Sequence, residues 1–67
     1  MKLWLTSSEL ADLALPELPA TDRGVRMLAE REGWERFSAW CRPRAGRGGG
    51  LEFHVNLLPM AARIAYL

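Results

Sequence analysis

The chain has one cysteine and one histidine among its 67 residues. A lone cysteine can form no internal disulfide, and it leaves no paired-cysteine ligand set for a metal ion. Apolar runs of about 18 residues, which a membrane-spanning helix needs, do not occur, and the opening MKLWLTSSEL lacks the long apolar segment of a signal peptide. These absences predict a reducing, intracellular location and no membrane partner.

Residue groupings typical of catalysis are also lacking. The sequence offers no nucleophile paired with a base, no metal-ligand cluster and no assignable set of catalytic acids. His54 alone is interpreted as a surface or hydrogen-bonded residue, and Cys41 as a small apolar residue without redox work. We therefore expect a binding domain that is not an enzyme and needs no cofactor.

What is present indicates one small globular domain, spanning residues 1–67. Apolar residues make up 49% of the chain and charged residues 25%, a composition typical of folded rather than disordered proteins. The net charge is only +1, but residues 36–50 carry four arginines and no acid, whereas residues 1–22 carry one lysine and four acids. The positive field is therefore local, and it favours an anionic partner near residues 36–50.

The first half of the chain predicts a strand followed by two helices. MKLWLT alternates like a short strand, with Leu3 and Leu5 on one face. Thr6 followed by Glu9 forms a capping-box pattern, so a short helix should begin near Ser7. After a proline-broken turn, residues 22–32 show the apolar spacing of a second helix, with Thr21 as its N-terminal cap and Gly33 as its left-handed end. Gly24 inside this helix indicates close approach of a neighbouring helix or of a ligand backbone.

The second half predicts a hairpin and a final helix. WERFSAWC alternates weakly and LEFHV alternates clearly, so CRPRAGRGGG between them should be the tip of a hairpin. LLPMAARIAYL is typical of a helix with proline in its first turn, and we expect Leu57, Met60, Ala61, Ile64 and Ala65 to pack on the core. The predicted fold is α+β, in the order β-α-α-β-wing-β-α, which is the plan of a small winged helix-turn-helix.

A set of spaced residues across this plan resembles the Mu-type DNA-binding domain, found at the N-terminus of phage Mu transposase and repressor and of their prophage relatives. The set comprises Leu15-Pro16, Leu18-Pro19, Thr21, Gly24-Val25, Ala29, Gly33-Trp34, Glu52-Phe53, Leu58-Pro59 and Ala62-Arg63. The resemblance implies a winged helix whose second helix enters the major groove of duplex DNA and whose wing touches the minor groove or backbone. It further implies an operator or enhancer-type site and a bacterial cytoplasmic location on DNA.

Two groups of residues are candidate DNA contacts. Arginines can pair with guanine edges or phosphates, a helix N-terminus favours phosphate, and glycines let a backbone approach a groove closely. The alternatives are a solvated amphipathic helix, with an Arg26–Glu30 surface pair, and a disordered Gly/Arg loop without a partner. The helix candidates are Thr21, Asp22, Arg23 and Arg26; the wing candidates are Arg42, Arg44, Arg47, Gly46 and Gly48.

Three functions remain open at this point. The first is sequence-specific duplex binding by the N-terminal domain of a Mu-like transposase, with other copies of the full-length protein as further partners and any catalytic core beyond residue 67. The second is a Mu-like repressor domain that regulates transcription. The third is a protein-interaction module. The three tryptophans could also stack on single-stranded bases, but we expect Trp4 and Trp34 in or beside the core and Trp40 nearer the surface.

Overall fold

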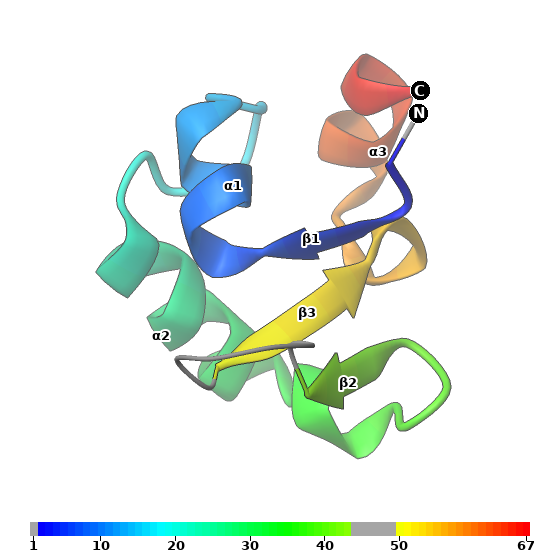
Figure 1. Ribbon diagram of the computed structural model, residues 1–67. Coiled ribbons are helices and arrows are strands. Elements are labelled where there is room, and N and C mark those ends of the chain that lie inside the picture. Colours follow the sequence, from blue (N-terminus) through cyan, green and yellow to red (C-terminus); the bar gives the residue numbers. More distant parts are fainter. Residues whose placement is uncertain (1, 44–49) are drawn as a thin grey trace.

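The computed structural model describes residues 2–43 and 50–67, shown in Figure 1. The predicted order is confirmed, with two additional 3-10 turns (η1 and η2). The elements are β1 (Trp4–Thr6), α1 (Ser7–Asp12), α2 (Asp22–Glu32), η1 (Trp34–Arg36), β2 (Cys41–Pro43), β3 (Leu51–His54), η2 (Val55–Leu57) and α3 (Met60–Tyr66). The fold class, a winged helix-turn-helix with a small antiparallel sheet, is the one that the sequence predicts.

The sheet joins the N-terminal strand to the hairpin. Its strand order is β1-β3-β2, with both pairings antiparallel, so β3 is the central strand. Phe53 of β3 lies opposite Leu5 of β1 on one side and Cys41 of β2 on the other. Because successive side chains alternate between the faces of a sheet, these three point toward the helices, and their neighbours in each strand point away.

Both predicted helix starts are confirmed by their hydrogen bonds. The Thr6 side chain accepts from the backbone N–H of Glu9 at 3.2 Å, while the Glu9 carboxylate accepts from the N–H of Thr6 at 2.9 Å. Lys2 also binds this carboxylate at 2.6 Å, and together these donors lower the pKa of Glu9. In α2, the Thr21 side chain accepts from the N–H of Gly24, and Gly33 ends the helix with a φ of 68°.

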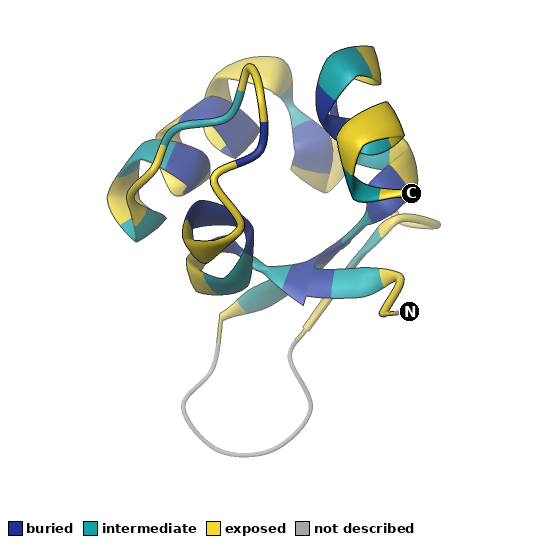
Figure 2. Ribbon diagram, turned by 90° about the horizontal axis from the view of Figure 1, so that it is seen from above, coloured by how far each residue is buried: buried dark blue, intermediate teal, exposed yellow. Residues whose placement is uncertain are grey.

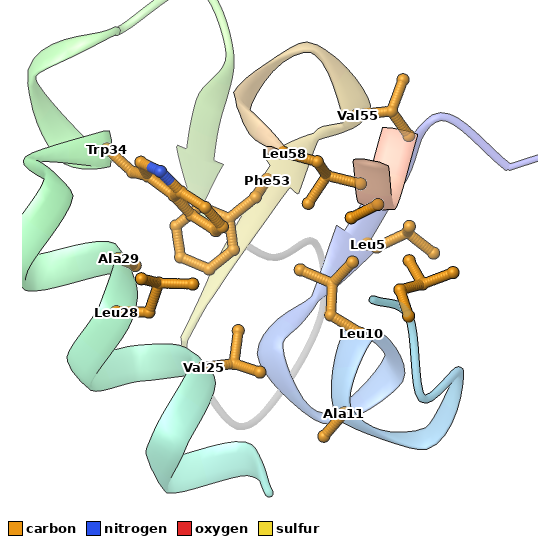
Figure 3. Close-up of a cluster of buried hydrophobic side chains, with 12 residues drawn as sticks. Leu5, Leu10, Ala11, Val25, Leu28, Ala29, Trp34, Phe53, Val55 and Leu58 are labelled. Carbon is orange, nitrogen blue, oxygen red and sulfur yellow. The ribbon is translucent and has the colours of Figure 1, made fainter. Parts of the chain in front are cut away.

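One hydrophobic core lies between the two N-terminal helices and the sheet. Figure 3 shows the Trp34 and Phe53 rings together beside Leu28 and Ala29 of α2, with Leu5 and Leu10 in the same cluster, and Figure 2 marks the buried residues on the helices and the sheet. The Trp34 and Phe53 rings meet edge to face, with centroids 5.1 Å apart. The core residues are Leu5, Leu10, Ala11, Leu15, Val25, Leu28, Ala29, Trp34, Phe53, Val55, Leu58 and Ala62.

The prediction that the first hairpin strand begins at Trp34 is wrong. Residues 34–36 form a 3-10 turn, and the strand begins only at Cys41. Gly33 reverses the chain in a left-handed conformation, which directs Trp34 into the core. Burial of this large indole ring determines the local backbone more strongly than the weak alternation of the sequence does. Leu3 was also misplaced, because it precedes β1 and is exposed.

The packing face of the last helix differs from the prediction as well. Met60 and Ile64 are 67% and 69% exposed, whereas Ala62 is fully buried. The small side chain of Ala62 lets α3 approach the core closely, and Tyr66 fixes its end by donating a hydrogen bond to the Lys2 carbonyl at 2.6 Å. Leu57, which precedes the helix, does pack against the core as expected.

The turn between the two helices explains why residue 24 is a glycine. A Cβ added at this position would lie 2.6 Å from Cβ of Pro19 and 2.8 Å from Oγ1 of Thr21. The part of the chain that approaches closely is therefore the proline turn, and not the neighbouring helix that the sequence suggested. Glycine thus permits the short connection that brings α1 against α2.

Leu10→Ala should strongly destabilise the fold. Leu10 is fully buried between the helices, and truncating a buried leucine costs about 2–5 kcal/mol through lost burial and the cavity left behind. Leu13→Ala is the matched control, because Leu13 is 42% exposed at the end of the same helix. Urea unfolding monitored by circular dichroism should separate the two variants. Equal losses would contradict the assignment of Leu10 to the core.

Candidate nucleic-acid interface

Helix α2 presents a continuous exposed face on the side opposite to its buried residues. Val25, Leu28 and Ala29 are buried against the core. The residues at the opposing helical positions are exposed, and their side chains are long and mostly charged, namely Arg23, Arg26, Met27, Glu30 and Arg31. The helix is therefore anchored on one side and free along the other, as a groove-binding helix must be.

The four helix candidates differ in what they contact. Thr21 is exposed and caps the helix through its side-chain oxygen, which leaves its hydroxyl hydrogen able to donate to an anion. Arg23 is exposed on the outward face. The Arg26 guanidinium donates to the Asp22 carboxylate at 2.6 Å. The surface pair expected as an alternative thus forms with Asp22, one turn earlier, and not with Glu30.

Asp22 connects the two helices of the helix-turn-helix unit. One carboxylate oxygen accepts a hydrogen bond from the Ser7 hydroxyl at the start of α1, and the other accepts from Arg26. Ser7 is buried although it is polar, so this bond satisfies a group that would otherwise be left without a partner. The carboxylate also lies in the first turn of α2, where the helix dipole favours negative charge.

The base of the wing is fixed by Arg42 on the outer face of the sheet. Its Nε donates to the Glu52 carboxylate at 3.0 Å, across the β2–β3 pair. Its guanidinium carbon lies 4.1 Å from the centroid of the Trp4 ring, close enough for a cation–π interaction. Trp4 in turn meets the His54 ring edge to face, with centroids 5.2 Å apart. The other wing candidates, Arg44, Gly46, Arg47 and Gly48, lie outside the described residues.

A cleft of about 670 Å³ separates α2 from the base of the wing. The start of α1 closes it on a third side. The ionisable residues that line it are Asp22, Arg26, Glu30 and Glu35, which give one positive and three negative charges. Because these charges repel a phosphate, the cleft itself is a poor backbone-binding channel.

The remaining aromatic and titratable residues mostly support the fold. Trp34 is in the core and Trp4 is half-buried, as expected, while Trp40 is exposed and stacks on Phe37 with ring centroids 6.0 Å apart. His54 accepts a hydrogen bond from the N–H of Asn56 at 3.1 Å. Burial and the nearby Glu35 charge raise the pKa of the Cys41 thiol, which disfavours the reactive thiolate.

Sequence reasoning missed three residues of the exposed α2 face, Met27, Glu30 and Arg31. The candidates were selected from the first turns of the helix. The helical spacing of these three residues relative to Arg23 and Arg26 could have found them. Within the described part of the chain, no helix is long and apolar enough to cross a membrane.

Comparison with known proteins places this geometry in a family. The family model described as the Mu DNA-binding domain matches residues 9–67. This chain belongs to the Mu DNA-binding domain family. It is 40% identical over 52 residues to Mu-like prophage FluMu transposase A of Haemophilus influenzae, a match that covers 78% of this chain but only 7% of that relative. The chain thus spans a small fraction of the curated transposase that it matches.

A solved member of the family has the same fold. The structure described as the DNA-binding domain of Mu transposase, a novel class of winged helix-turn-helix protein, superposes with a TM-score of 0.71 and 40% sequence identity. The match covers 97% of this chain and 79% of that one. The Mu-type resemblance noted in the sequence is confirmed, and the domain is a DNA-binding domain of the Mu transposase type.

Asp22→Ala should loosen the packing of α1 against α2. The variant loses the Ser7 bond, the Arg26 pair and the favourable helix-dipole charge, for a combined cost of about 1–2 kcal/mol. Asp12→Ala is the matched control, because Asp12 is an exposed acid in α1. A double-mutant cycle with Ser7→Ala, measured by urea unfolding, should give a coupling of about 1 kcal/mol. Strictly additive losses would show that the Ser7–Asp22 bond contributes nothing.

Arg42→Ala should destabilise the sheet more than Arg42→Lys does. The alanine variant leaves Glu52, whose side chain is only 13% exposed, without its cation, at a cost of about 1 kcal/mol. Lysine can keep both the ion pair and the contact with the Trp4 ring. Thermal unfolding should show that the alanine variant is the less stable of the two. In a Glu52→Gln background, most of this difference in stability between Arg42→Ala and Arg42→Lys should disappear. An unchanged difference in that background would mean that Glu52 is not the partner that matters.

Proposed function

We propose that this domain binds double-stranded DNA sequence-specifically as the N-terminal part of a Mu-like transposase, and so supports DNA transposition. The observation that carries the proposal is the exposed face of α2, whose arginines and glutamate project from a helix fixed to the core on its other side. In this proposal α2 enters the major groove of an operator or enhancer-type site. The wing then lies on the minor groove or the backbone.

The proposed contacts divide between base recognition and phosphate attraction. Arg23 and Arg26 on α2 can reach guanine edges, and Thr21 at the helix start can donate to a phosphate. Asp22 supports this surface by holding Arg26 in place. We assign phosphate or minor-groove contact to the wing, with Arg42 at its base and Arg44, Gly46, Arg47 and Gly48 beyond it.

The wing must supply most of the electrostatic attraction. Helix α2 carries three arginines and three acids, so its own net charge is zero. Residues 36–50 carry four arginines and no acid. Since non-specific affinity for duplex DNA comes largely from neutralised phosphates, the arginines of this segment should dominate the salt dependence of binding.

The transposase role is favoured over the repressor role by the identity of the relatives. Both the curated relative and the solved structure are described as transposases or parts of one. In the proposed setting, the domain acts on DNA in the bacterial cytoplasm and helps full-length copies assemble there. The catalytic step of transposition would belong to other parts of such a protein, and this domain would supply recognition alone.

Binding to a duplex should weaken steeply with salt. If about three arginines neutralise phosphates, log K should fall against log salt with a slope of about −3. Arg44→Ala and Arg47→Ala should each reduce the magnitude of that slope by about one. Arg63→Ala is the matched control, because Arg63 lies on α3, away from α2 and the hairpin in Figure 1.

Fluorescence anisotropy with a labelled duplex at several salt concentrations measures these slopes. Circular dichroism confirms that each variant retains the fold. Salt-independent binding would contradict the electrostatic part of the proposal. Unchanged affinity in the Arg44→Ala and Arg47→Ala variants would remove the wing from the interface, and absence of duplex binding would favour the protein-interaction alternative.

A further inference from the structure

Met27 occupies an unusual position on α2. It is 60% exposed, and among the described residues it is the one large apolar side chain that this helix turns toward solvent. It lies one helical turn after Arg23 and one turn before Arg31, on the side opposite to the buried Val25 and Ala29. Met27 is thus near the middle of the face that the proposed function directs into the groove.

The core gives no reason for methionine at this position. The buried face of α2 is already formed by Val25, Leu28 and Ala29, and Met27 lies outside the core cluster. Its neighbours on the outward face are charged, and Arg26 among them is held by Asp22. A flexible, polarizable thioether therefore projects from a row of otherwise charged side chains.

The major groove of DNA offers one kind of apolar partner. Adenine, guanine and cytosine present hydrogen-bonding atoms there, whereas thymine adds a 5-methyl group. An apolar side chain at the centre of a groove-facing helix can bury that methyl without competing for a polar base edge. Its neighbours Arg23 and Glu30 have the chemistry for the adjacent contacts, because arginine pairs with guanine and a carboxylate accepts from the amino group of cytosine.

We propose that Met27 is a specificity-determining residue, and that it recognises a thymine in the bound site through the 5-methyl group. The inference rests on the proposed function, since it requires α2 to lie in the major groove. It adds to that function a particular chemical group on the DNA and the side chain that contacts it.

Substitution of uracil for thymine provides the test, because uracil lacks only the methyl group. A preferred duplex is first selected from a randomised library with the domain itself. Each thymine is then replaced by uracil in turn, and affinities are compared by fluorescence anisotropy. At one position the replacement should weaken binding about threefold to fivefold, as expected for losing one buried methyl group.

Two variants connect that position to Met27. In Met27→Ala, thymine and uracil should bind equally well at the sensitive position, while other base preferences remain. In Met27→Leu, which keeps an apolar side chain of similar size, the preference for thymine should persist. Because Met27 is exposed, neither change should alter the thermal midpoint appreciably.

Met60→Ala is the matched control. Met60 is 67% exposed on α3, so its replacement by alanine should leave the response of binding to uracil unchanged. The inference is overturned if no thymine is sensitive to uracil, or if the sensitivity survives in Met27→Ala. Either result, obtained with a duplex that binds tightly, leaves the proposed function intact. Failure to select any duplex would instead count against the proposed function itself.

Discussion

The packing of Phe53 at the centre of the sheet is the contact on which the rest of the fold depends. It lies between Leu5 and Cys41 in the strand register and meets the Trp34 ring edge to face. One buried side chain thereby ties together the N-terminal strand, the hairpin and the segment after α2. In a chain of 67 residues, where little apolar surface is available, such a shared contact allows a single core to hold every element.

Because the core packs against only one side of α2, the other side of the helix is free. Apolar side chains hold the inner face of the helix, while the cap at Thr21, the Asp22 link to α1 and the turn at Gly33 fix its start and end. The outward side chains are consequently presented on a rigid support rather than on a loop. A rigid support lowers the ordering cost of binding, which suits a helix that must enter a groove in one orientation.

Much of the fold follows from local chemistry that the sequence shows directly. Thr6 with Glu9, Thr21 and Gly33 each predicted a helix boundary, and all three are confirmed because caps are local interactions. The strand expected from Trp34 and the apolar face of α3 were misjudged. In both, a group far away in the sequence takes part in the outcome, because the Phe53 ring packs against Trp34 and the Lys2 backbone carbonyl accepts a hydrogen bond from Tyr66.

The sequence alone determined the order of elements, the clustered positive charge and the membership of the Mu DNA-binding domain family, since these depend on spacing and composition. The tertiary structure decided which charges are already engaged. It bonds Asp22 to Ser7 of α1 and pairs Arg42 with Glu52, and it turns Met27 outward at the centre of the α2 face. These features depend on how α1 packs against α2 and how β2 registers with β3, and such long-range contacts form only when the chain folds.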